Sequence, residues 1–142
     1  MIKLDDNSRM CLGIGVIGSK NFKDSDLIHA WLDRLNKELG PFDKIVIGGI
    51  GGTDSSAQKW AKNNQIEIKF HYADWSTYGK KAVYVRNILI VDNSDILVVF
   101  WDGDSKDSAH AIRIARASNK HLLVISERGE INEILSNIKL SD

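Results

Sequence analysis

The residues best suited to hold a ligand in this sequence are glycines followed by hydroxyl and charged side chains. The stretch GGIGGTDSS, residues 48–56, places four glycines ahead of a threonine and an aspartate. Glycines let the backbone approach an anion closely, and the first turn of a helix offers unpaired N–H groups. The alternative is a sharp turn that Thr53 or Asp54 caps. Four glycines exceed what a cap requires, so we interpret this stretch as a binding loop for a phosphate-like group.

A second stretch, GIGVIGSKNF at residues 13–22, imitates two phosphate-binding motifs without satisfying either. Its glycines spell G-x-G-x-x-G, but Gly13 and Gly15 fall inside an apolar strand, where they let neighbouring helices pack closely, and the next strand ends in glycines instead of an acid. A P-loop needs Ser or Thr after its lysine, and Lys20 is followed by neither. What remains is a tight turn at residues 18–20, which is either an anion site or an ordinary connection.

Two further loops carry charged and aromatic side chains. The segment 71–87, HYADWSTYGKKAVYVRN, follows one apolar segment, and WDGDS at 101–105 follows another. Trp75 and Trp101 could each stack on a base or belong to the core. Three carboxylates near one cleft would also suit acid–base chemistry, because their mutual repulsion raises a pKa. No His or Asp spacing fits a metal site, and no nucleophile–base pair is legible, so we predict neither metal nor cofactor.

The order of the elements would bring these loops to one edge of a sheet. Apolar segments at 11–18, 43–49, 66–70, 95–101 and 121–126 are predicted strands. Helices are predicted from about 25 to 39, at 53–64, 80–91 and 108–117, and last at Ile131, Ile134, Leu135 and Ile138, with Asp24 as an N-cap. The alternation predicts one α/β domain with a five-stranded, mostly parallel sheet covered by helices on both faces. Such sheets bind ligands outside the carboxyl ends of their strands.

Composition limits the classes of partner. The chain has 142 residues, of which 43% are hydrophobic and 27% charged, and 19 basic residues equal 19 acidic ones. We therefore expect no basic field that attracts nucleic acid, and no apolar run reaches the length of about 18 residues that spans a membrane. A single cysteine, Cys11, favours a reducing, cytoplasmic location. Residues 1–10 are expected to form a polar leader ahead of a domain at 11–142.

Several motifs in order resemble the YspA-type branch of the SLOG superfamily. They are G-S-[RK]-x-F-x-D, G-G-x-x-G-x-D-x-x-A-x-x-W-A, A-D-W-x-x-x-G-K-x-A, R-N and F-W-D-G-x-S, at residues 18–24, 48–61, 73–82, 86–87 and 100–105. The resemblance implies a Rossmann-like fold and a nucleotide or nucleotide-derived ligand. Relatives include the Lonely Guy phosphoribohydrolases and anti-phage sensor domains for ADP-ribose-type signals.

Some positions depart from the family pattern. Lys20 stands where arginine is usual, Lys106-Asp107-Ser108 replaces a Gly-Thr pair, and Ser56 takes the place of the hydrolases' glutamate. Hydrolysis is therefore not carried over, although Asp54 and Asp102 stay candidate acid–base residues. The predicted ligand-binding residues are Gly18, Ser19, Lys20, Phe22, Gly48, Gly49, Gly51, Gly52, Thr53, Asp54, Asp74, Trp75, Lys80, Arg86, Asn87, Trp101, Asp102 and Ser105.

Three functional hypotheses follow. The first is a cytoplasmic protein that binds a phosphorylated nucleotide or ADP-ribose-type small molecule, as a sensor or by sequestering a signal such as those of anti-phage defence. The second is an N-glycosidase or phosphoribohydrolase. The third is a structural oligomerisation domain. We favour binding over catalysis, and expect a homo-oligomer with no nucleic-acid or membrane partner.

Overall fold

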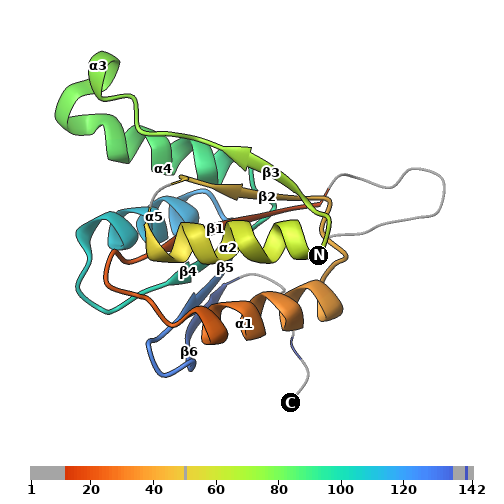
Figure 1. Cartoon of the computed structure of the whole chain (residues 1–142). Helices are drawn as coiled ribbons and strands as arrows, with labels where there is room; N and C mark the ends of the chain where they lie inside the picture. The colour runs from red at the N-terminus through yellow and green to blue at the C-terminus, as the bar shows by residue number, and fades with distance from the viewer. Residues whose placement is uncertain (1–11, 50, 136–139, 141–142) are drawn as a thin grey trace.

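The protein is built around one six-stranded sheet. The computed structural model describes residues 12–49, 51–135 and 140, so the expected leader and Cys11 lie outside the described residues. The strands are β1 (Gly13–Gly18), β2 (Lys44–Ile47), β3 (Glu67–Phe70), β4 (Ile96–Phe100), β5 (His121–Ile125) and β6 (Ile131–Leu135). Their order is β3-β2-β1-β4-β5-β6, with the first five parallel and β6 antiparallel (Figure 1). This is the Rossmann-like arrangement, in which the order reverses between β1 and β4.

Helices cover both faces of the sheet, as predicted. The helices are α1 (Ser25–Glu38), α2 (Gly52–Asn63), α3 (Trp75–Tyr78), α4 (Ala82–Asp92) and α5 (Lys106–Ala117), with a short 3-10 helix η1 (Gly79–Lys81). Helices α1 and α2 pack on one face and α4 and α5 on the other. Strand β4 contributes Ile96, Val98 and Phe100 to the first core and Leu97 and Val99 to the second, because successive side chains of a strand alternate between faces.

The termini of α1 follow the sequence closely. The Asp24 side chain accepts a hydrogen bond from the Leu27 N–H at 3.0 Å, which confirms the predicted N-cap. Helix α1 buries Ile28, Trp31, Leu32 and Leu35, the residues that recur at helical spacing. The helix predicted at residues 80–91 begins later, at Ala82 of α4, because α3 and η1 precede it.

The last predicted helix is wrong. Ile131 and Ile134 lie in strand β6, which pairs antiparallel with β5, so the sheet has six strands rather than five. Apolar residues three and four apart fit one helix face, but β6 covers an edge of the sheet that a helix would leave unpaired. Arg116 of α5 pairs with Glu133 and fixes this strand from outside. Ile138 lies outside the described residues.

Glycines of β1 bring neighbouring elements very close. A Cβ on Gly15 would overlap the Ser94 hydroxyl, and a Cβ on Gly18 would overlap the Thr53 side chain at the start of α2. Gly13 and Gly15 lie inside β1, as predicted, but the atoms nearest to them belong to β2, β4 and the residues that follow α4 instead of to the body of a helix. Close contact at Gly18 places the first turn of α2 beside the end of β1. Within the described ranges, no helix combines the length and apolarity needed to cross a membrane.

Candidate functional site

A pocket lies at the carboxyl ends of β1 and β2, bordered by α2, the segment after β3, α4 and α5. Its volume is about 350 Å³. The strand order reverses next to β1, so the pocket occupies the position where open α/β sheets bind ligands. Its lining residues are Val16, Ile17, Gly18, Ser19, Lys20, Gly48, Gly51, Gly52, Thr53, Asp54, Ala73, Trp75, Val83, Arg86, Ile90, Ser105, Asp107 and Ser108.

Eleven of the eighteen predicted ligand-binding residues line this pocket. They are Gly18, Ser19, Lys20, Gly48, Gly51, Gly52, Thr53, Asp54, Trp75, Arg86 and Ser105. The other seven do not line it: Phe22, Gly49, Asp74, Lys80, Asn87, Trp101 and Asp102. Phe22 is a core residue that packs against the Phe100 ring, and Gly49 lies against Tyr72. Trp101 donates its indole N–H to the Ser105 carbonyl at 3.1 Å and packs on the α4–α5 side of the core.

The turn after β1 is held rigidly from three elements. The Ser19 N–H donates to the Phe100 carbonyl at 2.9 Å, which continues the β1–β4 pairing. The buried Ser19 hydroxyl accepts from the Asp102 N–H at 3.0 Å and lies 3.4 Å from the Ser108 hydroxyl. Ser19 therefore joins β1, β4 and α5 and fixes the shape of the pocket, while the exposed Lys20 leaves its ammonium at the rim.

Helix α2 begins with a glycine N-cap and no side-chain cap. Gly51 has φ 108° and ψ 173°, a conformation that side chains avoid, although no atom lies within 4 Å of the position of its absent Cβ. The Thr53 hydroxyl donates to the Phe22 carbonyl at 3.1 Å and is buried, so it holds the helix instead of facing a ligand. The donors that α2 presents to the pocket are thus backbone N–H groups of its first turn.

Arg86 crosses the pocket from α4 over Gly48. Its Cδ and Nε lie 3.2 and 3.3 Å from the position of a Cβ on Gly48, and an Asp54 carboxylate oxygen lies 3.2 Å from the same point. The Arg86 Nε is buried without a hydrogen-bond partner, and one terminal nitrogen donates to Asn87 at a long 3.4 Å. Buried Asn87 in turn donates to the Asp107 carbonyl at 3.0 Å and ties α4 to α5. A guanidinium has five N–H donors, so Arg86 retains capacity for an anion.

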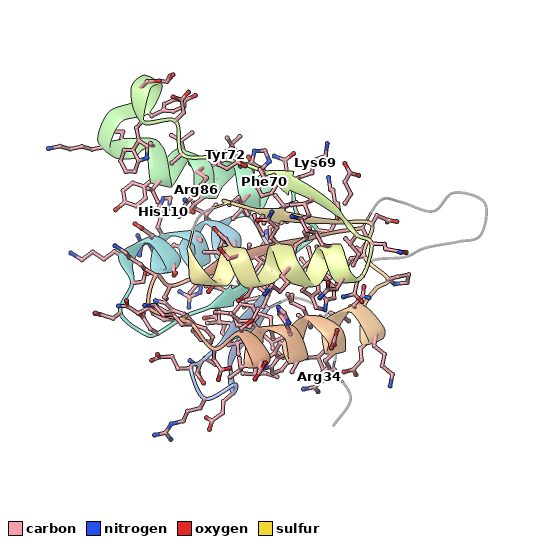
Figure 2. All side chains as sticks on the ribbon, viewed as in Figure 1. Arg34, Lys69, Phe70, Tyr72, Arg86 and His110 are labelled. Atoms are coloured by element: carbon pink, nitrogen blue, oxygen red, sulfur yellow. The ribbon has the colours of Figure 1, made fainter. Side chains whose placement is uncertain are left out.

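Exposed aromatic rings gather on the segment between β3 and α4, from which Trp75 lines this pocket. Among the described residues, the exposed aromatics are Tyr72 (59%), Trp75 (58%), Tyr78 (48%) and Tyr84 (41%), all between β3 and the first turns of α4. Tyr72 stacks on Phe70 with ring centres 5.4 Å apart, and Tyr84 packs on His110 of α5 at 4.3 Å. Figure 2 shows Tyr72, Arg86 and His110 toward the same end of the molecule, well away from Arg34 on α1. Lys80 and Lys81 of η1 are exposed in the same segment.

The acid–base candidates are separated by the fold. Asp102 accepts from the Ser105 N–H at 2.8 Å and the Asp104 N–H at 2.9 Å, and these backbone bonds, that of Ser105 first, lower the pKa of Asp102. Asp74 caps α3, where hydrogen bonds from Thr77 and then Ser76 lower the pKa of Asp74. Both groups stay ionised near neutral pH and lie outside the pocket lining. Asp54 is the acid–base candidate that lines the pocket.

The sequence interpretation omitted seven lining residues. They are Val16, Ile17, Ala73, Val83, Ile90, Asp107 and Ser108. Most are apolar and form walls from β1 and the inner side of α4, where their burial made them resemble ordinary core. For Ile17 and Ala73 the available signal was a position at or shortly after the end of an apolar strand. Ser108 donates its N–H to the Ser105 hydroxyl, which caps α5.

A solved structure resembles this fold and corrects the functional prediction. DNA processing protein A from Helicobacter pylori, described for its single-stranded DNA binding mode, aligns with 93% of this chain and 69% of its own, with a TM-score of 0.58 and 20% identity. The predicted sensor or sequestering protein for a nucleotide-type small molecule, without a nucleic-acid partner, is contradicted by this likeness to a DNA-binding protein. The exclusion of nucleic acid rested on net charge, which sums over the whole surface and does not describe the cations at one pocket.

Sequence comparisons agree with the motifs. The family model described as YspA, cpYpsA-related SLOG matches residues 14–78. Gene 61 protein of Mycobacterium phage D29 is 34% identical over 110 residues, which cover 71% of this chain and 86% of the phage protein. The matched residues run from β1 to the end of α3 and so include Trp75 and the four glycines of residues 48–52, which we call the glycine loop. The chain belongs to the YspA, cpYpsA-related SLOG family.

Proposed function

We propose that the protein binds single-stranded DNA along the carboxyl edge of its sheet. A backbone phosphate occupies the polar end of the pocket, and neighbouring bases stack on the exposed aromatic rings. The observation that carries this proposal is that the exposed ring of Trp75 lines the same pocket as an arginine with unused donors. The likeness to DNA processing protein A adds support from the fold.

The phosphate contacts come from α2 and α4. The uncapped first turn of α2 supplies backbone N–H groups and the positive end of the helix dipole. Arg86 supplies a guanidinium held in place over Gly48, and Lys20 adds charge at the rim. A guanidinium that loses little freedom on binding forms strong hydrogen bonds to phosphate oxygens.

The aromatic rings select single strands over duplexes. Bases in a duplex are stacked on one another, whereas an unpaired base offers a free face to Trp75 or Tyr72. Each base–aromatic stack is worth about 1–3 kcal/mol. Because the chain carries no net charge, stacking supplies a larger share of the affinity than it does in strongly basic proteins.

The cytoplasmic location and the homo-oligomer expected from the sequence stay predictions, as does a role in anti-phage signalling.

Fluorescence anisotropy with a labelled thymidine strand of about 20 nucleotides tests the proposal. We expect binding to the strand, much weaker binding to the same sequence as a duplex, and a shallow dependence on salt. Trp75→Ala should weaken binding about ten-fold, since one stack is lost. Ile134→Ala is the matched control, because it removes a partly exposed apolar side chain from β6. Equal affinity for strand and duplex, or no binding to either, contradicts the proposal.

A further inference from the structure

The pocket is larger and more apolar than a phosphate requires. A phosphate would occupy the end formed by the glycine loop and Arg86, which leaves much of the volume of about 350 Å³ unfilled. The remaining walls include Ile17 of β1 and Val83 and Ile90 of α4. A flat, partly apolar group attached to the phosphate fits this space, and in a DNA strand that group is a base.

Two acidic residues line the same pocket, Asp54 beside Arg86 and the exposed Asp107 on the α5 side. Asp107, in the first turn of α5, lines it, and its backbone carbonyl is engaged by Asn87. Within the described part of the chain, its carboxylate forms no hydrogen bond and no ion pair. A carboxylate beside a phosphate subsite repels the strand unless another part of the strand donates hydrogen bonds to it.

The four bases differ in what they offer such a carboxylate. Guanine presents two adjacent donors, its ring N–H and its amino group, which a carboxylate can accept together. Cytosine and adenine present an amino group beside an acceptor. Thymine presents one N–H between two carbonyl oxygens, which repel a carboxylate. Aspartate and glutamate accept hydrogen bonds from base amino groups in DNA complexes generally.

Building on the proposed DNA binding, we infer that the pocket takes one unstacked base of the strand and that Asp107 selects guanine over thymine. The base lies between the apolar side chains of Ile17 and α4, and its donor edge meets the Asp107 carboxylate. Reading an unstacked base by hydrogen bonds to its pairing edge is a known solution for proteins that accept bases into pockets. The inference assigns to Asp107 a role in specificity, separate from the phosphate contacts.

Competition between strands of alternating composition tests this inference. The probes are about twelve nucleotides long, with thymidine alternating with guanosine, cytidine or thymidine, so that a chosen base is available in every second register. We expect the guanosine strand to bind about ten-fold more tightly than the all-thymidine strand. In Asp107→Asn this ratio should fall to about one, because an amide presents a donor where guanine also presents a donor.

Asp104→Asn is the matched control, since this exposed carboxylate precedes α5 but lies outside the pocket lining. It should keep the preference for guanosine. Equal affinity of the wild-type protein for all strands would overturn the inference and leave DNA binding in place. A guanosine preference that persists in Asp107→Asn would overturn the assignment to Asp107. Absence of binding to every strand would overturn the proposed function itself.

Discussion

Replacing Arg86 with alanine should weaken DNA binding while leaving the stability of the fold nearly unchanged. The variant loses a charge-assisted contact to a phosphate, which is worth about 1.5–3 kcal/mol. Since 1.4 kcal/mol is a factor of ten, the affinity for a thymidine strand should fall about ten- to one-hundred-fold.

The same change should leave the free energy of unfolding nearly unaltered, because two terms oppose each other. Removing the buried, unpartnered Nε relieves a penalty of about 1–3 kcal/mol. Losing the alkyl stem against Gly48 costs about 0.8 kcal/mol for each CH₂ group that is fully buried, and Arg86 is only partly buried. The described residues contain no ion pair of Arg86 whose loss would add a further cost.

Anisotropy titration and urea unfolding of the same samples provide the measurement. Arg34→Ala is the control, because Arg34 lies on α1, far from the pocket, and its pair with Glu38 contributes little at the surface (Figure 2). Wild-type affinity in Arg86→Ala would refute the assigned phosphate contact. Reduced affinity that accompanies a large loss of stability would instead mean that Arg86 supports the fold.

Three other changes test the scaffold. Gly18→Ala should destabilise the protein by about 1–3 kcal/mol in urea unfolding, because its Cβ overlaps α2, whereas Gly52→Ala meets ordinary contact distances and should be nearly neutral. Asp24→Ala should cost about 1 kcal/mol by the same measurement, through loss of the N-cap of α1. The hydrogen bond from Arg116 lowers the pKa of Glu133 in the folded state, so the unfolded state binds more protons and this part of the stability falls as the pH drops through the acidic range. Arg116→Ala should flatten that acid-side loss slightly in unfolding curves at a series of pH values, and an unchanged pH dependence would contradict the assignment.

The layered fold was predictable because its signals are local. Strand β4 is apolar at every position, which places it centrally in a sheet covered on both faces, and Asp24 marks the start of α1. The last strand was not predictable in the same way. Ile131 and Ile134 satisfy the helical spacing, and the choice of strand depends on pairing with β5, a contact that local periodicity does not encode.

Some residues of the candidate site were predictable from the sequence, and others were not. The glycine loop and Arg86 were found because strand ends collect at one edge of a parallel sheet. Trp101 and Asp102 share that edge, but their side chains turn to the Ser105 backbone, and sequence spacing gives no direction for a side chain. Thr53 shows the same limit, because its hydroxyl is already committed to the Phe22 carbonyl.

The position of Arg86 over Gly48 has a consequence for how this protein can diverge. A methyl group at residue 48 would press on the arginine stem and on Asp54 at the same point, so residue 48 cannot become larger freely while residue 86 is an arginine. Homologues that carry a larger residue at position 48 should carry a residue shorter than arginine at position 86. Such homologues would need a cation from another element to bind the anion. A glycine at residue 48 is therefore expected wherever an arginine of α4 binds it.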